Sequence, residues 1–328
     1  MLILSESDLR SVLTMKNVID AVEEGFRALA RGEANVPDRL RLDVPDHNGI
    51  VLEMPAYVGS SGGEQSALGT KIVSVFERNP ARGLDSIQSV YLLLDSETGA
   101  PLSLMDGRFI TAVRTAATSA VATKYMASPG PKRLAVFGAG VQARFHIDAM
   151  IEVAQIERVV IVSRNAENAR VLADVVSESH KLPSEVVSAE QAVVTANLIC
   201  TCTSSPAPLF DGKLLARGTH INAVGAFTPS TRELDSETVR RARVILDAES
   251  AAGREAGEIL IPIAEGVINH EHVKGMLADV VSGKVAGRES LDEITLFKSC
   301  GLAIEDLETA RLAFARARAE ELGSEIQL

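Results

Sequence analysis

The segment with the most specific chemistry is a glycine-rich turn, in which Gly138, Gly140 and Ala143 follow the apolar run 134–137 with the spacing G-x-G-x-x-A. Gly138 allows a tight turn, Gly140 lets the backbone approach a pyrophosphate, and Ala143 lets the next helix pack closely on the strand. The N-terminus of that helix would then face the phosphates of a dinucleotide. Taken alone, the same spacing also fits a glycine-rich turn in any α/β protein.

The sequence that follows favours dinucleotide binding. A helix is expected over 141–153, and the apolar run 158–162 suits a buried parallel strand, which completes a β-α-β unit of roughly 30 residues. Ser163, Arg164 and Asn165 then stand where an enzyme that uses NAD usually carries an acidic residue. A carboxylate would repel a 2′-phosphate, whereas Arg164 offers a planar fork of donors, so we expect NADPH, with NADH as the second choice. The alternative is that Arg164 only begins a solvated helix.

Two charged residues stand in apolar surroundings. Lys71 shares one face of an expected strand with Val73 and Val75, so it lies either at a sheet edge, which is the favoured interpretation, or in a pocket. Arg114 lies in a helix expected over 110–122, whose small residues indicate burial on nearly all sides. A buried arginine needs an anionic partner, which is either a carboxylate of the same chain or a ligand carboxylate.

The N-terminal third reads as a sheet region without helical crossovers. A helix over 14–31, with Thr14 as its N-cap and Gly32 as its stop, precedes that region. Strands are expected at 39–44, 50–54, 68–76, 89–94 and 101–105, and a hairpin turn at 95–99 joins the last two. This pattern predicts a mixed α+β domain that is distinct from the Rossmann-type part.

Beyond the glycine-rich unit, helices and buried strands alternate. A capping box opens a helix at Ser188, and a closing amphipathic helix over 304–322 is expected to return to the N-terminal domain. Ligands of open α/β sheets bind at the carboxyl ends of the strands. The expected strands 198–203 and 219–224 therefore place four residues at the nicotinamide pocket, namely Thr203, Ala223, Val224 and Gly225.

Composition limits the class of protein. A chain of 328 residues that is 46% hydrophobic is long enough for two globular domains. A net charge of −11, no tryptophan and three tyrosines argue against nucleic acid as a partner. The three cysteines lack both metal-site spacing and the density of a disulfide scaffold, so we expect a cytoplasmic protein without a metal. No run of 18 apolar residues or signal peptide is present, so we expect no membrane association.

The chain resembles the ornithine cyclodeaminase/μ-crystallin family along nearly its whole length. The matching segments occur in the family's order and are 54–56 (MPA), 69–73 (GTKIV), 111–117 (TAVRTAA), 137–143 (FGAGVQA), 221–226 (INAVGA), 232–235 (RELD) and 295–301 (TLFKSCG). The resemblance implies a homodimer with NAD(P)H bound in the cleft between two domains. It also implies chemistry that forms or reduces C=N bonds beside a carboxylate.

The resemblance assigns an α/β fold class and a role to each domain. A Rossmann-type doubly wound parallel sheet over 119–303 binds the cofactor, and a mixed α+β domain over 1–118, completed by 304–328, binds the substrate and dimerises. Arg39, Lys71 and Arg114 match the family's substrate-carboxylate and catalytic cluster, which favours a ligand as their common partner. Cofactor-contact positions, beside Gly138 and Gly140, are taken by Ser86, Thr115, Val141, Gln142, Thr203, Ala223, Val224 and Ser299.

Two departures from the family pattern bear on the reaction. Cyclodeaminases are expected to carry an aspartate two residues before the proline of the stretch 225–229, and here Phe227 stands there. They also carry a glutamate three residues before the proline of Met-Pro, where this chain has Leu52, while Glu53 points to the other strand face. A free δ-ammonium of ornithine would lack its counter-charges, whereas Phe227 would suit the methylenes of a ring.

The sequence therefore predicts an oxidoreductase that uses NADPH to reduce a cyclic α-imino acid to the L-amino acid. Δ1-Pyrroline-2-carboxylate and Δ1-piperideine-2-carboxylate are the expected substrates, as for the ketimine reductases of the family. Lys71 is the expected catalytic residue, with Arg39, Arg114 and Phe227 as substrate contacts. The alternatives are ornithine cyclodeamination, then alanine or another amino-acid dehydrogenation, then a non-catalytic protein that binds a small ligand in an NADPH-dependent manner.

Overall fold

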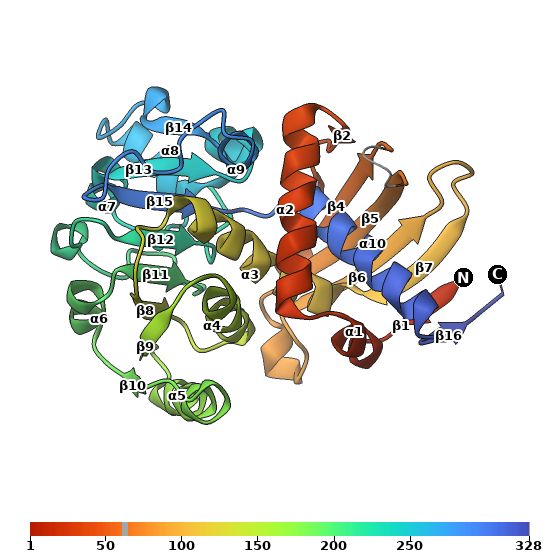
Figure 1. Ribbon diagram of the computed structural model, residues 1–328, viewed down its shortest axis with the longest axis horizontal. Coiled ribbons are helices and arrows are strands. Elements are labelled where there is room, and N and C mark those ends of the chain that lie inside the picture. The colour runs from red at the N-terminus through yellow and green to blue at the C-terminus, as the bar shows by residue number, and fades with distance from the viewer. Residues whose placement is uncertain (61–64, 328) are drawn as a thin grey trace. The chain divides into compact units, whose positions relative to one another are not determined.

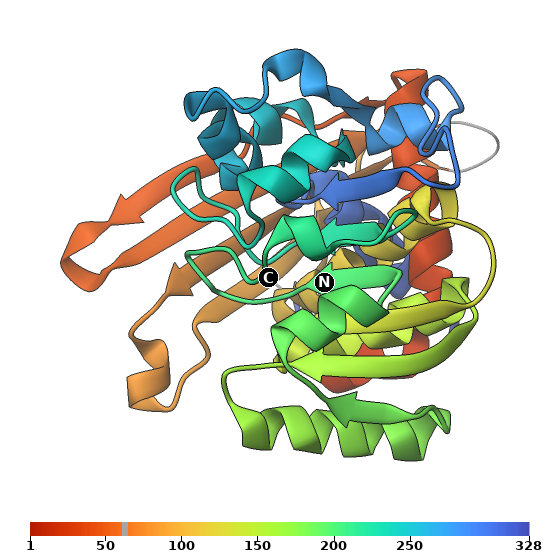
Figure 2. The same cartoon turned by 90° about the vertical axis from the view of Figure 1, so that its left-hand side faces the viewer.

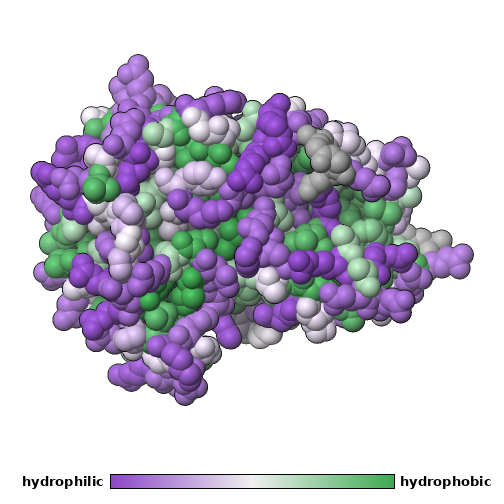
Figure 3. Space-filling view, viewed as in Figure 1, coloured by the Kyte–Doolittle hydropathy of each residue, from purple (hydrophilic) through white to green (hydrophobic). Residues whose placement is uncertain are grey.

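The computed structural model describes residues 1–60 and 65–327, and the chain divides into two units. One unit is Met1–Arg114 with Leu302–Leu328, and the other is Thr115–Gly301. Helix α3 (Gly107–Met126) runs from the first unit into the second. Hydrophilic side chains dominate the molecular face in Figure 3, with apolar residues in scattered groups. None of the helices in the described part is both long and apolar enough to cross a bilayer.

The first unit is built on an eight-stranded sheet with the order β16-β1-β7-β6-β5-β4-β2, and β3 pairs with β4 as well. Strands β5 and β7 alternate between buried and more exposed residues, because helices cover one face of the sheet. Their bounds are β1 (Leu2–Leu4), β2 (Ala34–Asn35), β3 (Leu40–Val44), β4 (Gly49–Val58), β5 (Ala67–Phe76), β6 (Ile87–Leu94), β7 (Pro101–Asp106) and β16 (Ser324–Glu325).

Besides the start of α3, three helices lie in the described part of this unit, together with the 3-10 turns η1 (Pro45–His47) and η2 (Asn79–Arg82). They are α1 (Glu6–Val12), α2 (Met15–Arg31) and α10 (Ala303–Ala319). Helix α10 packs against α2 and against β4, β5 and β6, as Figure 1 shows, so the closing helix does return to the N-terminal sheet. Thr14 caps α2 and Gly32 ends it with φ of 74°, so both predicted boundary residues are confirmed.

The second unit is a parallel sheet with the order β10-β9-β8-β11-β12-β15-β13-β14. Its strands are β8 (Lys132–Phe137), β9 (Ile156–Val162), β10 (Ser184–Val186), β11 (Leu198–Thr201), β12 (His220–Ala223), β13 (Ala242–Leu246), β14 (Val273–Met276) and β15 (Ile294–Lys298). Figures 1 and 2 show helices on both faces of this sheet, as expected for a Rossmann-type domain.

The connecting segments of the second unit are mostly helical. They are α4 (Val141–Val153), α5 (Ala166–His180), α6 (Ala189–Thr195), η3 (Gly212–Leu214), α7 (Ser236–Arg241), η4 (Ala251–Glu255), α8 (Gly257–Ala264), η5 (His270–His272) and α9 (Leu277–Val281). The predicted capping box is present, because the Ser188 hydroxyl accepts from Gln191 N–H and the Gln191 side chain accepts from Ser188 N–H. The core between sheet and helices is apolar and includes Phe137, Ile199, Ile221 and Leu296.

Candidate active site

Lys71 lies on the covered face of the first unit's sheet, in a strand that has neighbours on both sides. Its strand β5 runs between β4 and β6, where Lys71 pairs with Met54 on one side and Tyr91 on the other. Residues directly opposite in a sheet point to the same face, and all three side chains are buried, Lys71 at 1% exposure. The prediction that Lys71 sits at a sheet edge is therefore wrong, because the strands that precede and follow β5 in the chain pair with it on both sides.

Helix α10 supplies the partners of Lys71 and Arg114. The Lys71 ammonium donates to Asp306 Oδ2 at 2.7 Å, and the Arg114 guanidinium donates to Asp306 Oδ1 at 2.9 Å and to Glu305 Oε2 at 2.5 Å. Asp306 and Glu305 are fully buried, and Arg114 is 5% exposed. Two cations and two carboxylates thus form one buried cluster, and an intramolecular partner for Arg114 is present.

The cluster gives its two cations different proton affinities. Burial, followed by the positive charge of Arg114, lowers the pKa of Lys71 to about 8, although Asp306 acts in the opposite direction. Burial also acts to lower the pKa of Arg114, but Asp306 and Glu305 outweigh it and raise that pKa above its ordinary value. Arg114 is consequently a fixed charge, whereas Lys71 can gain or lose a proton near neutral pH.

Lys71 also keeps donors for a ligand. An ammonium group has three N–H donors, and among the described residues its one hydrogen-bond partner is Asp306. The neighbouring Tyr91 hydroxyl is buried without a hydrogen-bond partner in the part of the chain that the structure describes. Burial, with Asp306 and Glu308 nearby, raises the pKa of Tyr91 well above its ordinary value, so the phenol stays neutral. These donors suit a ligand that presents a carboxylate or an imine nitrogen.

The strand β5 makes room for Tyr91 with a glycine. A Cβ at Gly69 would lie 2.5 Å from the Tyr91 hydroxyl oxygen and 2.9 Å from the carbonyl oxygen of Leu92. Sequence reasoning missed Tyr91, Glu305 and Asp306 as site residues. The sequence signal for Tyr91 was weak, because its pairing with Lys71 follows only from the register of two strands. Glu305 and Asp306 lie in the first turn of α10, where acidic residues are common in any helix.

Arg39 and Ser86 each lie just before a strand of the first unit's sheet. Arg39 directly precedes β3, whose Leu40 pairs with Glu53, so the antiparallel register puts Arg39 beside Met54 in the same row as Lys71. The carbonyl oxygen of Ser86 accepts from the Phe76 N–H at 2.8 Å, in the loop before β6. Both side chains are half-buried.

The glycine-rich turn of the second unit has the shape that a pyrophosphate requires. Gly138 has φ of 117°, and a Cβ there would lie 2.6 Å from the carbonyl oxygen of Cys202. Gly140 precedes α4 without a side-chain cap, and a Cβ there would meet nothing within 4 Å. Val141 is 66% exposed, and Gln142 Oε1 is buried without a hydrogen-bond partner among the described residues. Open N–H groups at this helix start fit a dinucleotide's phosphates.

The end of β9 presents Arg164 and no carboxylate. The Ser163 hydroxyl accepts from the Asn165 N–H at 3.2 Å, and Asn165 caps α5 by accepting from the Asn168 N–H at 3.0 Å. Arg164 is exposed between them. Of the three residues expected to hold a 2′-phosphate, Arg164 is thus the one whose side chain takes no part in this local capping.

A buried glutamate fixes the loops after β11 and β12. Glu233 accepts from the Thr203 N–H and hydroxyl, both at 2.7 Å, from the Thr201 hydroxyl at 2.8 Å and from the Gly225 N–H at 2.7 Å. Burial raises the pKa of Glu233, although these donors act in the opposite direction. Glu258 in turn accepts from the Glu233 N–H at 2.9 Å and pairs with Lys298 at 3.2 Å. Glu233 entered the sequence analysis only as part of a family segment.

The remaining predicted contacts lie at the carboxyl ends of neighbouring strands or next to them. Ala223 ends β12 and is buried, and Val224 and Phe227 follow it with half-buried side chains. The Ser299 hydroxyl, just after β15, donates to Asp247 Oδ2 at 2.9 Å. Thr115 lies in α3, where the second unit begins. The second unit thus gathers most of the predicted cofactor contacts at one edge of its sheet.

Comparison with known proteins relates the whole chain to enzymes that act on imino and amino acids. A solved Δ1-pyrroline-2-carboxylate reductase from Thermococcus litoralis, in complex with NADH and L-proline, is 43% identical, with a TM-score of 0.95 over 99% of this chain and 100% of that one. An archaeal alanine dehydrogenase dimer with bound NAD is 32% identical, with a TM-score of 0.94 over 100% and 99%. A Δ1-pyrroline-2-carboxylate reductase from Bacillus cereus is 35% identical over the full length of both chains. A sequence model of the ornithine cyclodeaminase/mu-crystallin family matches residues 1–321, so the chain belongs to that family.

Proposed function

We propose that this protein reduces a cyclic α-imino acid, Δ1-pyrroline-2-carboxylate or Δ1-piperideine-2-carboxylate, to the L-amino acid. The observation that carries the proposal is the buried pair of Lys71 and Arg114, in a chain similar over its full length to pyrroline-2-carboxylate reductases. The pair supplies one permanently protonated group and one titratable group beside it, both held in place by carboxylates of α10. This combination suits an imine that carries a carboxylate on the reacting carbon.

Each predicted site residue has a separate role in the proposed reaction. Arg39 and Arg114 hold the substrate carboxylate, since guanidinium groups bind carboxylates in a bidentate manner and so fix the orientation of the reacting carbon. Lys71 donates to the substrate beside the imine nitrogen and keeps that nitrogen protonated, which makes the carbon more electrophilic. Phe227 provides an apolar wall for the ring methylenes. When bound, the reduced nicotinamide supplies the hydride that converts the C=N bond into CH–NH.

The reducing cofactor we assign is NADPH. The support is the end of β9, which lacks the carboxylate that would hydrogen-bond the 2′-hydroxyl of NAD and carries an exposed Arg164 instead. Gly138 and Gly140 shape the turn before α4 for the pyrophosphate. The Thr203 and Gly225 backbones, both held by Glu233, line the nicotinamide end together with Ala223 and Val224.

The working form we assign is a cytoplasmic homodimer. The uncovered face of the first unit's sheet carries a row of paired residues that includes Leu40, Ile72 and Val90, which are 60%, 45% and 43% exposed. An apolar face of this kind is typical of an interface between subunits. Ile72→Lys should convert the dimer to a monomer, as measured by light scattering. Val171→Lys is the control, because Val171 lies on α5 in the other unit and is also an exposed apolar residue, at 58%, and it should leave the dimer intact. A parent protein that is a monomer would refute the assignment.

The proposed reaction is tested by following NADPH and NADH oxidation with Δ1-pyrroline-2-carboxylate, with L-proline identified as the product. Parallel reactions contain ornithine with NAD, assayed for ammonia, and pyruvate with ammonia and NADH, assayed for alanine. Rapid NADPH oxidation without ammonia release is the expected result. Ammonia and proline from ornithine, without imine reduction, would establish a cyclodeaminase, and alanine formation alone would establish an alanine dehydrogenase.

A further inference from the structure

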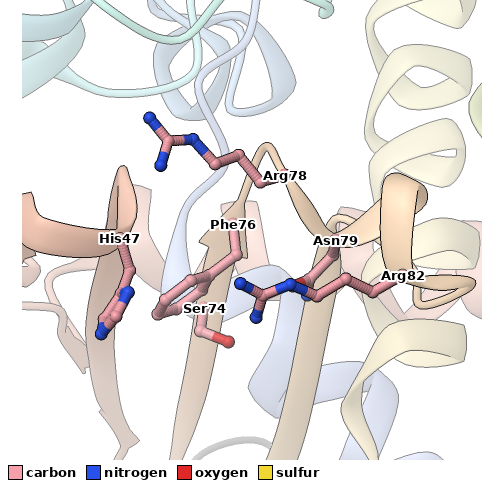
Figure 4. Close-up of a pocket in the computed structure, with 6 residues that line it drawn as sticks. All are labelled: His47, Ser74, Phe76, Arg78, Asn79 and Arg82. Carbon is pink, nitrogen blue, oxygen red and sulfur yellow. The ribbon is translucent and has the colours of Figure 1, made fainter.

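Two groups of charged side chains outside the Lys71 cluster differ in burial. The first lines a surface pocket that opens on the sheet face proposed for the subunit interface, and its Arg78 and Arg82 are exposed (Figure 4). The second lies in the other unit and is fully buried, since Glu233, Glu258 and Lys298 are each at 0% exposure. Charges that are shielded from water interact strongly with other charges nearby, so the buried group is the one that can act on a reaction.

Glu233 holds the two loops that carry predicted nicotinamide contacts. Its Oε1 accepts from the Thr203 N–H and hydroxyl at 2.7 Å, and its Oε2 accepts from the Gly225 N–H at 2.7 Å and the Thr201 hydroxyl at 2.8 Å. The loops meet at Gly225, where a Cβ would lie 2.0 Å from the Thr203 carbonyl oxygen. A nicotinamide that contacts these loops therefore lies near the carboxylate that holds them.

The hydrogen bonds of Glu233 favour its ionised form. Each carboxylate oxygen accepts one backbone N–H, which can only donate, so a proton on either oxygen would compete with that donor. Burial raises the pKa of Glu233, against the opposing effects of Thr203, Lys298 and Thr201. The carboxylate is the form that all four donors satisfy at neutral pH.

Lys298 does not cancel the charge of Glu233. Its ammonium pairs with Glu258 Oε2 at 3.2 Å and donates to the carbonyl oxygens of Ala223 and Ala226. Glu258 Oε1 accepts from the Glu233 N–H at 2.9 Å, which joins the three groups into one network. Two carboxylates and one ammonium leave this buried network with a net charge of −1, next to the loops after β11 and β12.

We propose that Glu233 is a positioning residue whose negative charge favours the oxidised form of the bound nicotinamide. The ring is neutral in NADPH and becomes positive when its hydride leaves, with both electrons of the C–H bond, for the imine carbon. A fixed negative charge in a site with little water stabilises the positive charge that develops in this step. Glu233 has this role if the nicotinamide binds at these loops, as the proposed function requires.

The test compares the affinity of the full-length protein for NADP+ and NADPH, titrated by calorimetry without an imine substrate. Glu233→Gln should raise the ratio of the Kd for NADP+ to the Kd for NADPH about tenfold, the effect of one unit charge in a partly shielded site. Glu258→Gln should raise the ratio too, although its amide oxygen can still accept from the Glu233 N–H. Asp235→Asn is the matched control and should leave the ratio unchanged, because Asp235 caps α7 by accepting from the Thr238 N–H at 2.7 Å.

Two results would overturn the proposal. The first is an equal loss of affinity for both forms in Glu233→Gln, which would show that Glu233 only shapes the loops. The second is an unchanged ratio in Glu258→Gln, the variant that decides if unfolding midpoints show that Glu233→Gln is not folded. The same titrations with NAD+ and NADH make the result independent of the assignment of NADPH. A changed ratio without imine reduction would support this role of Glu233 and refute the proposed reaction.

Discussion

The role that we propose for Lys71 depends on its pKa of about 8, which burial and Arg114 lower from the ordinary value of 10.5. If the reaction needs the ammonium form, kcat/KM for imine reduction should be constant on the acidic side of this pKa and fall as the pH rises through about 8. A profile measured from pH 6 to about 10 with saturating cofactor checks this. Rates that keep rising above pH 9 would mean that Lys71 acts as a base.

Substitution of Lys71 tests its proposed role as a proton donor directly. Lys71→Met keeps the length of the side chain but removes the proton donor, and it should lower kcat/KM by about 10²-fold or more, the usual contribution of an acid-base group. The fall in kcat/KM at alkaline pH should also disappear in this variant. A loss within about threefold would assign the proton to another group, for which the buried Tyr91 hydroxyl is the next candidate.

Arg164 is the residue that we propose sets the preference between NADPH and NADH. Arg164→Gln should raise the KM for NADPH about tenfold or more, because a hydrogen bond to a charged group is lost, and should leave the KM for NADH within about twofold. Steady-state kinetics with each cofactor measure the difference. An equal rise for both cofactors would indicate that Arg164 acts on the fold of α5 rather than on the 2′-phosphate.

At the scale of elements, α10 is the part of the chain that tunes the site, although it lies far from the strands in the sequence. Asp306 acts to raise the pKa of Lys71, against burial and Arg114. Asp306→Asn should therefore move the alkaline fall in kcat/KM to lower pH, even where the variant is less stable.

Glu308→Gln provides the matched control on the same helix. Glu308 is also a buried carboxylate, at 2% exposure, but it is not among the groups that act on the pKa of Lys71. Asp306→Asn should lose more stability, because Asp306 pairs with two buried cations, but the position of the pH profile should change in Asp306→Asn and not in Glu308→Gln. An unchanged profile in Asp306→Asn would show that Asp306 serves only to hold α10 on the sheet.

At the scale of the whole molecule, two buried histidines make stability depend on pH. Burial lowers the pKa of His146 to about 4 and that of His220 to about 3, both from 6.5. The unfolded chain binds protons at these residues near pH 6.5 and the folded chain does not, so protons favour unfolding. The stability that the two neutral histidines contribute is fully present above pH 6.5 and is lost as the pH falls toward 4.

Denaturant unfolding between pH 7 and pH 5 measures this loss. Each histidine should contribute roughly 1 to 2 kcal/mol over that interval, because one pKa unit corresponds to about 1.4 kcal/mol. His146→Gln should flatten part of the dependence, since glutamine does not titrate and can still reach Ser119 or the Gln142 carbonyl oxygen. A parent protein whose stability does not change from pH 7 to pH 5 would contradict the prediction.

The sequence by itself determined the features that depend on neighbouring residues. Thr14 and Gly32 bound α2 because capping is local, and Ser188 and Gln191 form the predicted box for the same reason. The glycine-rich turn between β8 and α4 was predicted from Gly138 and Gly140, and Gly138 adopts the positive φ that favours glycine. The strands β3 to β7 of the first unit were also predicted from the sequence, whereas the short strands β1, β2 and β16 were not, because two or three residues are too few to show an alternating pattern.

The tertiary structure decided which charged groups meet. Lys71 is separated by 235 residues from Asp306, and no local pattern states that β5 is central or that α10 covers it. Burial then set the pKa values, because desolvation depends on every element packed around a group. Chemistry that needs opposite charges at hydrogen-bond distance is thus a property of the packed chain.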